Sequence, residues 1–333
     1  MSDKIGQIGI NPSSLFNTQD ILEFAQQLDN RPQVHSIWIP ESWGREAFVM
    51  LGAIAALTGK VKLGTSIVGM FSRTPATTAM AASTLDNISK NRTIIGIGAS
   101  TPILAENWHG IKFEYPLRRM KEYVTCFKVI SSGETINFNG NFFKLRNMKI
   151  LHPSTRKKIP LYLGAVNSGM IKLAIDIADG TILYLRPIDE LKETVQHISS
   201  MISKKSKDFE ICSVFITAIS NKNPDLARKR AAKTLAFYVA VGKYYNQFLS
   251  SHGFRNEVEK ITNEYQTNGI ENISKFVTDH MLDSLTIYGT VEDCIKSLKR
   301  FVSCGISLPI LQINPVKDNL ESIKDSLLLV ENA

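Results

Sequence analysis

Short apolar runs alternate along this chain with stretches in which apolar residues recur at helical spacing. Ile21, Phe24, Ala25 and Leu28 show the three- and four-residue spacing that places side chains on one face of a helix. Strands that helices cover on both faces read as continuous apolar runs. The runs that predict strands are residues 5–10, 34–40, 61–66, 93–98, 160–164, 180–185, 210–219 and 309–313. Eight such strands with helices between them predict an α/β fold, a (β/α)8 TIM barrel.

Two segments interrupt the alternation. Residues 134–145 alternate apolar and polar side chains around Asn139-Gly140, a dipeptide typical of a tight hairpin turn. Residues 223–282 are mostly helical in pattern and too long for one crossover. Two interpretations of the aromatic side chains there stay open, a cover over a site or an ordinary core. These side chains are Tyr238, Tyr244, Tyr245 and Phe248. We expect one barrel domain over residues 1–333 with these two insertions.

Composition limits the partners. The chain has 333 residues and a formal charge of +8, but its Lys and Arg residues are dispersed, so no nucleic-acid partner is expected. No apolar run reaches the length of a membrane span, and no leader follows Met1, which predicts a soluble, cytoplasmic protein without a membrane partner. The cysteines occur singly and without metal-ligand spacing, which predicts reduced thiols and no metal site.

Small residues stand where a ligand would approach two of the predicted strands. The strand at 61–66 runs through Gly64-Thr65-Ser66, and the strand at 93–98 ends on Gly96-Ile97-Gly98. Residues with little side chain at a strand end allow a flat cofactor to come close. A third turn of small residues, 163–169, leads into a helix whose N-terminal amides favour an anion. Taken without any resemblance, that turn is better explained as a generic barrel loop, because it has no GxGxxG or P-loop pattern.

Several motifs carry a family resemblance. Residues 64–98, with Arg73-Thr74-Pro75, Thr84-Leu85-Asp86, Ser89 and Arg92, are similar to the bacterial-luciferase-like superfamily. Other motifs narrow the resemblance to the branch of 5,10-methylenetetrahydromethanopterin reductase, whose enzymes use the deazaflavin coenzyme F420. These motifs are Glu41-Ser42-Trp43-Gly44-Arg45, Trp108-His109-Gly110 and Arg118-Arg119-Met120-Lys121-Glu122-Tyr123. A positive field would help to collect this anionic coenzyme with its phosphate and polyglutamate tail.

The resemblance implies a location for the coenzyme. In the family a cis peptide bond after the third strand forms a bulge behind the deazaflavin ring, and the matching bond is Ser66-Ile67. The phosphate is expected near Asn167 and Ser168. The candidate cofactor-binding residues are Glu41, Ser66, Ile67, Ala99, Gly164, Ala165, Val166, Asn167 and Ser168.

Two residues are candidates for handling a proton. Glu41 follows the second strand, where relatives commonly carry an acid, and a salt bridge to Arg45 is the alternative. His109 follows the fourth strand, and imidazole titrates near neutral pH; the alternative is a loop histidine bonded to a carbonyl. Ser42 stands where some relatives have His, and Asn11 stands where the methanopterin reductases have Glu.

Three functions remain open from the sequence. The first is a coenzyme F420-dependent oxidoreductase that moves a hydride to or from a small organic substrate, with methylenetetrahydromethanopterin or a related pterin as the leading substrate. The second is an FMN-dependent monooxygenase of the same fold, and the third is a non-catalytic ligand-binding relative. We also expect a homodimer, because helices near residues 45–57 and 75–89 carry apolar residues on several faces.

Overall fold

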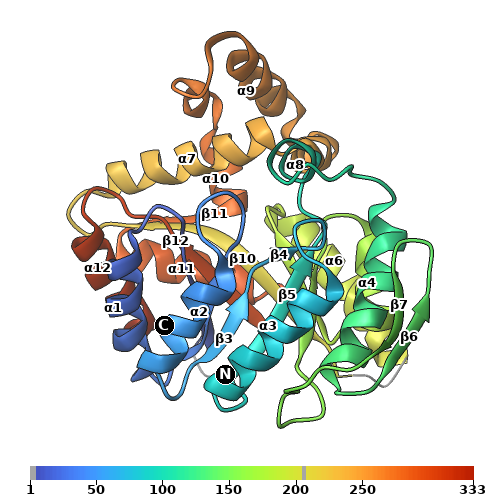
Figure 1. Cartoon of the computed structure of the whole chain (residues 1–333). Coiled ribbons are helices and arrows are strands. Elements are labelled where there is room, and N and C mark those ends of the chain that lie inside the picture. The colour runs from blue at the N-terminus through green and yellow to red at the C-terminus, as the bar shows by residue number, and fades with distance from the viewer. Residues whose placement is uncertain (1–4, 205–207) are drawn as a thin grey trace. The chain divides into compact units, whose positions relative to one another are not determined.

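The structure is a computed structural model that describes residues 5–204 and 208–333. Its residues form two compact units, each described here by itself. Unit 1 comprises Met1–His35 and Leu183–Ala333, and unit 2 comprises Ser36–Ile182. Strands alternate with helices through both units, and the main-sheet strands pair in parallel (Figure 1). The fold class is the predicted (β/α)8 barrel.

Unit 2 carries the strands from β2 (Val34–Ile39) to β9 (Gly180–Tyr184), in the spatial order β2-β3-β5-β8-β9. The register pairs Trp38 with Gly64 and Gly96 with Tyr162. Its other elements are α2 (Ala47–Leu57), β3 (Lys62–Thr65), β4 (Val68–Gly69), α3 (Pro75–Ile88), β5 (Thr93–Gly98), η1 (Leu104–Trp108), α4 (Pro116–Ser131), β6 (Ile136–Asn139), β7 (Lys144–Met148), β8 (Leu161–Gly164) and α5 (Ser168–Ile177).

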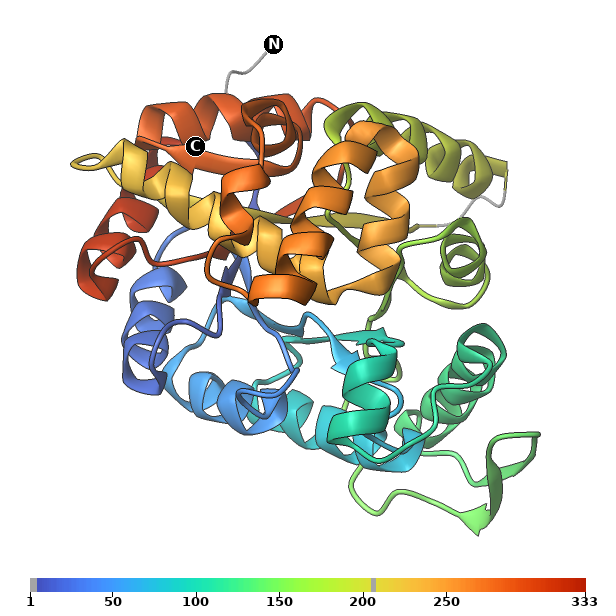
Figure 2. The same cartoon turned by 90° about the horizontal axis from the view of Figure 1, so that it is seen from above.

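Unit 1 carries β1 (Ile8–Pro12) in the parallel order β11-β10-β12-β1. Its other elements are α1 (Thr18–Asp29), α6 (Ile188–Lys204), β10 (Glu210–Ile219), α7 (Pro224–Val241), α8 (Lys243–Leu249), η2 (Ser250–Phe254), α9 (Arg255–Asn268), η3 (Ile273–Phe276), α10 (Asp279–Leu285), β11 (Thr286–Gly289), α11 (Val291–Val302), β12 (Leu308–Ile313) and α12 (Asn319–Asn332). The helices α7 to α10 confirm the helical insertion predicted at 223–282 (Figure 2). Their apolar faces share one core with β10 and β11.

Local signals explain where the helices of unit 2 begin. Thr74 caps α3 by accepting the amide of Thr77 at 3.1 Å, and Pro75 occupies the first helical turn, where its missing N–H costs nothing. Asn167 caps α5 by accepting the amide of Met170 at 3.0 Å. These caps fix the directions of the loops that precede α3 and α5, and both loops belong to the site described below.

The hairpin insertion is confirmed, but its turn differs from the prediction. β6 and β7 pair antiparallel, and Asn139 is the register partner of Lys144. The loop therefore runs over residues 140–143 instead of turning at Asn139-Gly140. Glu122 of α4 explains the difference, because its carboxylate accepts the amides of Asn141 at 2.9 Å and Phe142 at 2.8 Å.

The structure also adds a strand that the sequence pattern did not indicate. β11 pairs in parallel with β10 directly after α10. All four cysteines are free and buried. Among the described residues, none of the helices is both long and apolar enough to cross a bilayer. Residues 5–204 and 208–333 also hold no group of three or more His, Cys, Asp or Glu side chains arranged to bind a metal ion.

Candidate active site

The ends of β3, β5 and β8 form an apolar platform around Ile67. The Thr65 hydroxyl donates to the carbonyl of Gly96 and accepts its amide, both at 2.8 Å, which ties β3 to β5. The Ser66–Ile67 peptide bond is cis, as predicted. A Cβ placed on Gly98 would lie 2.7 Å from Cδ1 of Ile67, and one on Gly164 would lie 3.4 Å from its Cγ2. The glycines at these strand ends therefore make room for the Ile67 side chain, and the structure brings Ile67 and Gly164 together.

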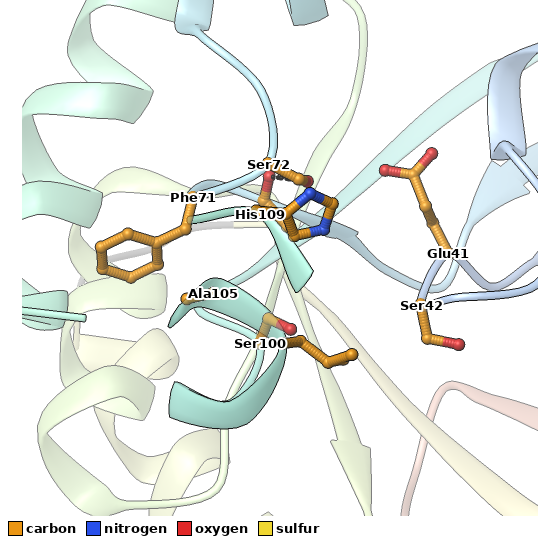
Figure 3. Close-up of a pocket in the computed structure, with 9 residues that line it drawn as sticks. Glu41, Ser42, Phe71, Ser72, Ser100, Ala105 and His109 are labelled. Atoms are coloured by element: carbon orange, nitrogen blue, oxygen red, sulfur yellow. Dashed lines mark hydrogen bonds between the residues drawn. The ribbon is translucent and has the colours of Figure 1, made fainter. Parts of the chain in front are cut away.

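A small, open pocket lies at the strand ends near this platform. Figure 3 shows the residues that line it, which come from the loops after β2, β4 and β5 and from η1 with the residue that follows it. Glu41 and His109, the two predicted proton-handling residues, both line it. The lining residues are Glu41, Ser42, Gly69, Phe71, Ser72, Ser100, Leu104, Ala105 and His109.

Glu41 is held by an arginine that sequence reasoning did not assign to it. Its carboxylate accepts Nε and Nη2 of Arg73, each at 3.0 Å, and the amide of Ala47 at 3.0 Å. The two side chains are only 12% and 13% exposed, and Arg73 also pairs with Glu46. Glu41 thus forms a salt bridge with Arg73, a partner other than the one the sequence suggested. The backbone amide of Glu41 donates to the carbonyl of Ile67 at 3.3 Å, which links this ion pair to the platform.

His109 is an exposed residue at the end of η1. Its backbone amide donates to the carbonyl of Leu104 at 3.1 Å. Within the described part of the chain its ring makes no hydrogen bond, so no carbonyl holds the imidazole. An imidazole without a fixed partner can turn toward a bound molecule and exchange a proton with it.

The remaining predicted cofactor residues lie along two strand ends. Ala99 follows β5, and its neighbour Ser100 lines the pocket with a φ of 64°, a conformation uncommon outside glycine and enriched at functional sites. Ala165 continues from β8, and its amide donates to the carbonyl of Ile182 at 3.1 Å.

The turn at 165–167 leads into α5, where Asn167 is the N-cap and Ser168 the first helical residue. Helix geometry leaves the first amides of α5 without carbonyl partners inside the helix. Val166 lies between Ala165 and the cap.

The two departures from the family pattern lie in different units. Ser42 lines the pocket of unit 2. Asn11, the last residue but one of β1 in unit 1, is 3% exposed, and its Oδ1 has no hydrogen-bond partner among the described residues. Sequence reasoning missed Phe71 and Ser72 as lining residues because they follow β4, a two-residue strand that only Ser66 and Ile67 separate from β3.

The chain belongs to the luciferase-like monooxygenase family, whose model matches residues 5–308. It is 28% identical over 295 residues to a 5,10-methylenetetrahydromethanopterin reductase of Archaeoglobus fulgidus, with 86% of this chain and 87% of that protein covered. It is 26% identical over 319 residues to a putative coenzyme F420-dependent oxidoreductase of Mycobacterium tuberculosis, with 89% and 90% covered.

Solved structures show the same fold. The coenzyme F420-dependent tetrahydromethanopterin reductase of Methanopyrus kandleri superposes with a TM-score of 0.83 at 20% identity, covering 96% of this chain and 97% of that one. An F420-dependent secondary alcohol dehydrogenase, in complex with an F420-acetone adduct, superposes with a TM-score of 0.75 at 18% identity, covering 98% of each chain. These similarities establish the (β/α)8 barrel of the luciferase-like type.

Proposed function

We propose that this protein is a coenzyme F420-dependent oxidoreductase that transfers a hydride between the coenzyme and a small organic substrate. The observation that carries the proposal is the Ile67 platform, which rests on Gly98 and Gly164 near a pocket that contains Glu41 and His109. The relative named a putative coenzyme F420-dependent oxidoreductase supports this coenzyme, and the relative named a 5,10-methylenetetrahydromethanopterin reductase supports a reductase activity.

The residues present fit a flat ring system. Ile67 offers an apolar contact. Gly98 and Gly164 place no side chain of their own beside it, and even a Cβ on Gly98 would clash with Ile67. The phosphate of the coenzyme would bind at Asn167 and Ser168, where the first turn of α5 presents amides with partial positive charge. Ser66, Ala99, Ala165 and Val166 would line the path between ring and phosphate.

The bound coenzyme supplies or accepts a hydride at C5 of its ring. The protein holds the acceptor carbon close to that position and excludes competing reactions. Glu41, fixed by Arg73 and by the start of α2, supplies a stationary carboxylate that accepts a hydrogen bond from the ring or the substrate. An imidazole nitrogen of His109 is the group free to deliver the proton that the reduced product needs.

The proposed substrate is methylenetetrahydromethanopterin or a related pterin. Asn11 is an amide and cannot donate and recover a proton as a carboxylic acid does, so the proton for a pterin product has to come from His109 or from Glu41. The test is the oxidation of reduced coenzyme F420 by this pterin under argon, followed by deazaflavin absorbance. Turnover by the wild-type protein supports the substrate, and no turnover excludes the pterin.

We also propose that the protein is a homodimer that joins through α2 and α3. These helices lie beside each other (Figure 1), and four of their apolar side chains are at least two-fifths exposed, namely Val49, Leu57, Met80 and Ile88. α2 is apolar on nearly all sides, a pattern that an exposed surface does not explain. A second copy of the chain is the partner that would cover this face.

A further inference from the structure

Arg119 of α4 is surrounded by aromatic rings. Its guanidinium carbon lies 5.1 Å from the ring centre of Phe71, 5.6 Å from that of Phe142 and 5.2 Å from that of Phe143. Phe71 lines the pocket, whereas Phe142 and Phe143 come from the loop of the β6–β7 hairpin. Rings around a guanidinium attract its charge and fix its plane, so Arg119 is a positioned cation at the edge of the pocket.

This cation has no counter-anion among the residues that the structure describes. Its Nε is buried without a hydrogen-bond acceptor, and no carboxylate of those residues lies within ion-pair distance. By contrast, Arg73 is paired with Glu41 and Arg156 with Asp86. A fixed arginine without a carboxylate is suited to an anion supplied by a ligand.

Glu122, the acidic residue nearest to Arg119 in the sequence, binds backbone amides instead of Arg119. Its carboxylate accepts the amides of Asn141, Phe142 and Phe143 at 2.9, 2.8 and 3.3 Å. Burial opposes ionisation, but these three donors hold the pKa of Glu122 below its usual range. Glu122 therefore stays charged and anchors the loop that places two of the rings around Arg119.

The position of Arg119 relates it to the phosphate end of the proposed coenzyme site. A Cβ placed on Gly169, in the first turn of α5, would lie 3.7 Å from Cδ2 of Leu117 in the first turn of α4. The starts of α4 and α5 are thus in contact, and Arg119 is two residues beyond Leu117. A phosphate at the start of α5 would therefore lie near the first turn of α4, which carries Arg119.

We propose that Arg119 binds the glutamate carboxylates of the coenzyme F420 tail, beyond the phosphate at Asn167 and Ser168. This inference rests on the proposed function. The flat guanidinium fork can hold a carboxylate through two parallel hydrogen bonds, and the three phenylalanine rings keep the fork oriented before the ligand arrives. Arg119 would thereby select the charged coenzyme over ring compounds that lack an acidic tail.

The test measures equilibrium binding by deazaflavin fluorescence with three probes. The probes are complete coenzyme F420, the form that ends at the phosphate and lactyl group without glutamates, and the bare ring with its ribityl chain. The variants are Arg119→Met and, as the matched control, Arg118→Met, which removes the exposed neighbouring arginine. Arg119→Lys keeps the positive charge but lacks the planar guanidinium group, which can donate two parallel hydrogen bonds.

We expect Arg119→Met to weaken binding of the complete coenzyme by about tenfold or more, the size typical of a charge-assisted hydrogen bond. Binding of the other two probes should stay unchanged, and Arg119→Lys should restore only part of the affinity. Arg118→Met should have a much smaller effect. Added salt should narrow the difference between wild type and Arg119→Met.

Three results would overturn the inference. Equal loss for all three probes would assign Arg119 a structural role, and loss with both phosphate-bearing forms would assign it to the phosphate. Unchanged affinity for the complete coenzyme would remove any binding role. Failure of the wild-type protein to bind any of the three probes would instead contradict the proposed function, and this inference with it.

Discussion

Arg73 donates two parallel hydrogen bonds, each 3.0 Å long, to the carboxylate of Glu41, which lies 32 residues earlier in the chain. The pair is largely buried, and the amide of Ala47 completes the coordination of the carboxylate. Removal of one member of such a pair leaves the other charge without compensation in a poorly solvated place. The pair therefore fixes both the local structure and the position of the carboxylate in the pocket.

We predict that Arg73→Met destabilises the protein, because Glu41 and Glu46 then lose their shared cation. The free energy of unfolding should fall by about 1–3 kcal/mol, as expected when a buried charged group loses its partner. Urea denaturation of Arg73→Met and of the exposed control Arg118→Met measures the difference. Equal midpoints for the two variants would show that the ion pair adds nothing to stability.

His109→Ala should lower kcat and leave the affinity for the coenzyme unchanged, because the imidazole has no structural bond to lose. The loss of a positioned general acid typically costs about 10²–10⁴-fold in rate. Glu41→Gln, which keeps the shape but removes the charge, is expected to weaken coenzyme binding together with the rate. Rates of deazaflavin oxidation and binding affinities for both variants decide the roles. Wild-type rates in both would exclude these residues from proton handling.

Gly164 offers a test of the platform. A Cβ at this position makes an ordinary contact with Ile67, so Gly164→Ala should fold normally, whereas Gly164→Phe should occupy the space of the ring and abolish coenzyme binding. Gly96→Ala is the contrasting variant, since its Cβ would lie 2.1 Å from the carbonyl oxygen of Thr65 and should disturb the fold itself. Thermal melting and fluorescence titration separate the two effects. Normal binding by Gly164→Phe would place the ring elsewhere.

Substitution of Met80 tests the proposed dimer. Met80→Glu on α3 should convert the dimer to a monomer, because a carboxylate on a covered apolar face would lose its water. Leu320→Glu on α12 is the matched control, since both side chains are 58% exposed. Light scattering at micromolar concentration reports the mass. A wild-type monomer, or a Met80→Glu dimer as stable as the control, would contradict the proposed interface.

Most of the fold follows from local patterns. The strand at residues 210–219 was predicted at its observed bounds, because a long apolar run and its flanking polar residues mark both ends. β11 escaped prediction because its four residues follow directly on α10 and have no turn residues between them. The hairpin loop differed from a two-residue turn because Glu122, distant in sequence, binds its amides.

In the site, too, some features follow from local sequence patterns and others depend on contacts between residues distant in sequence. Residues that follow strands, such as Ile67 and His109, could be proposed from the sequence because the carboxyl ends of barrel strands carry the functional loops. The partner of Glu41 was not found, since ion pairs between residues 32 positions apart depend on how β2 and α3 meet in space. Arg119 was noted only as part of a motif, because its three rings come from two separate loops.

We propose that the site binds a deazaflavin and carries out hydride transfer. The most direct measurement is a titration of the purified protein with coenzyme F420 and, separately, with FMN, followed by fluorescence and melting temperature. We predict saturable binding of coenzyme F420 at one molecule per chain, with a rise in melting temperature as expected for a ligand of the native state, and much weaker binding of FMN. Tight binding of FMN without binding of coenzyme F420 would contradict the account and favour a flavin-dependent monooxygenase.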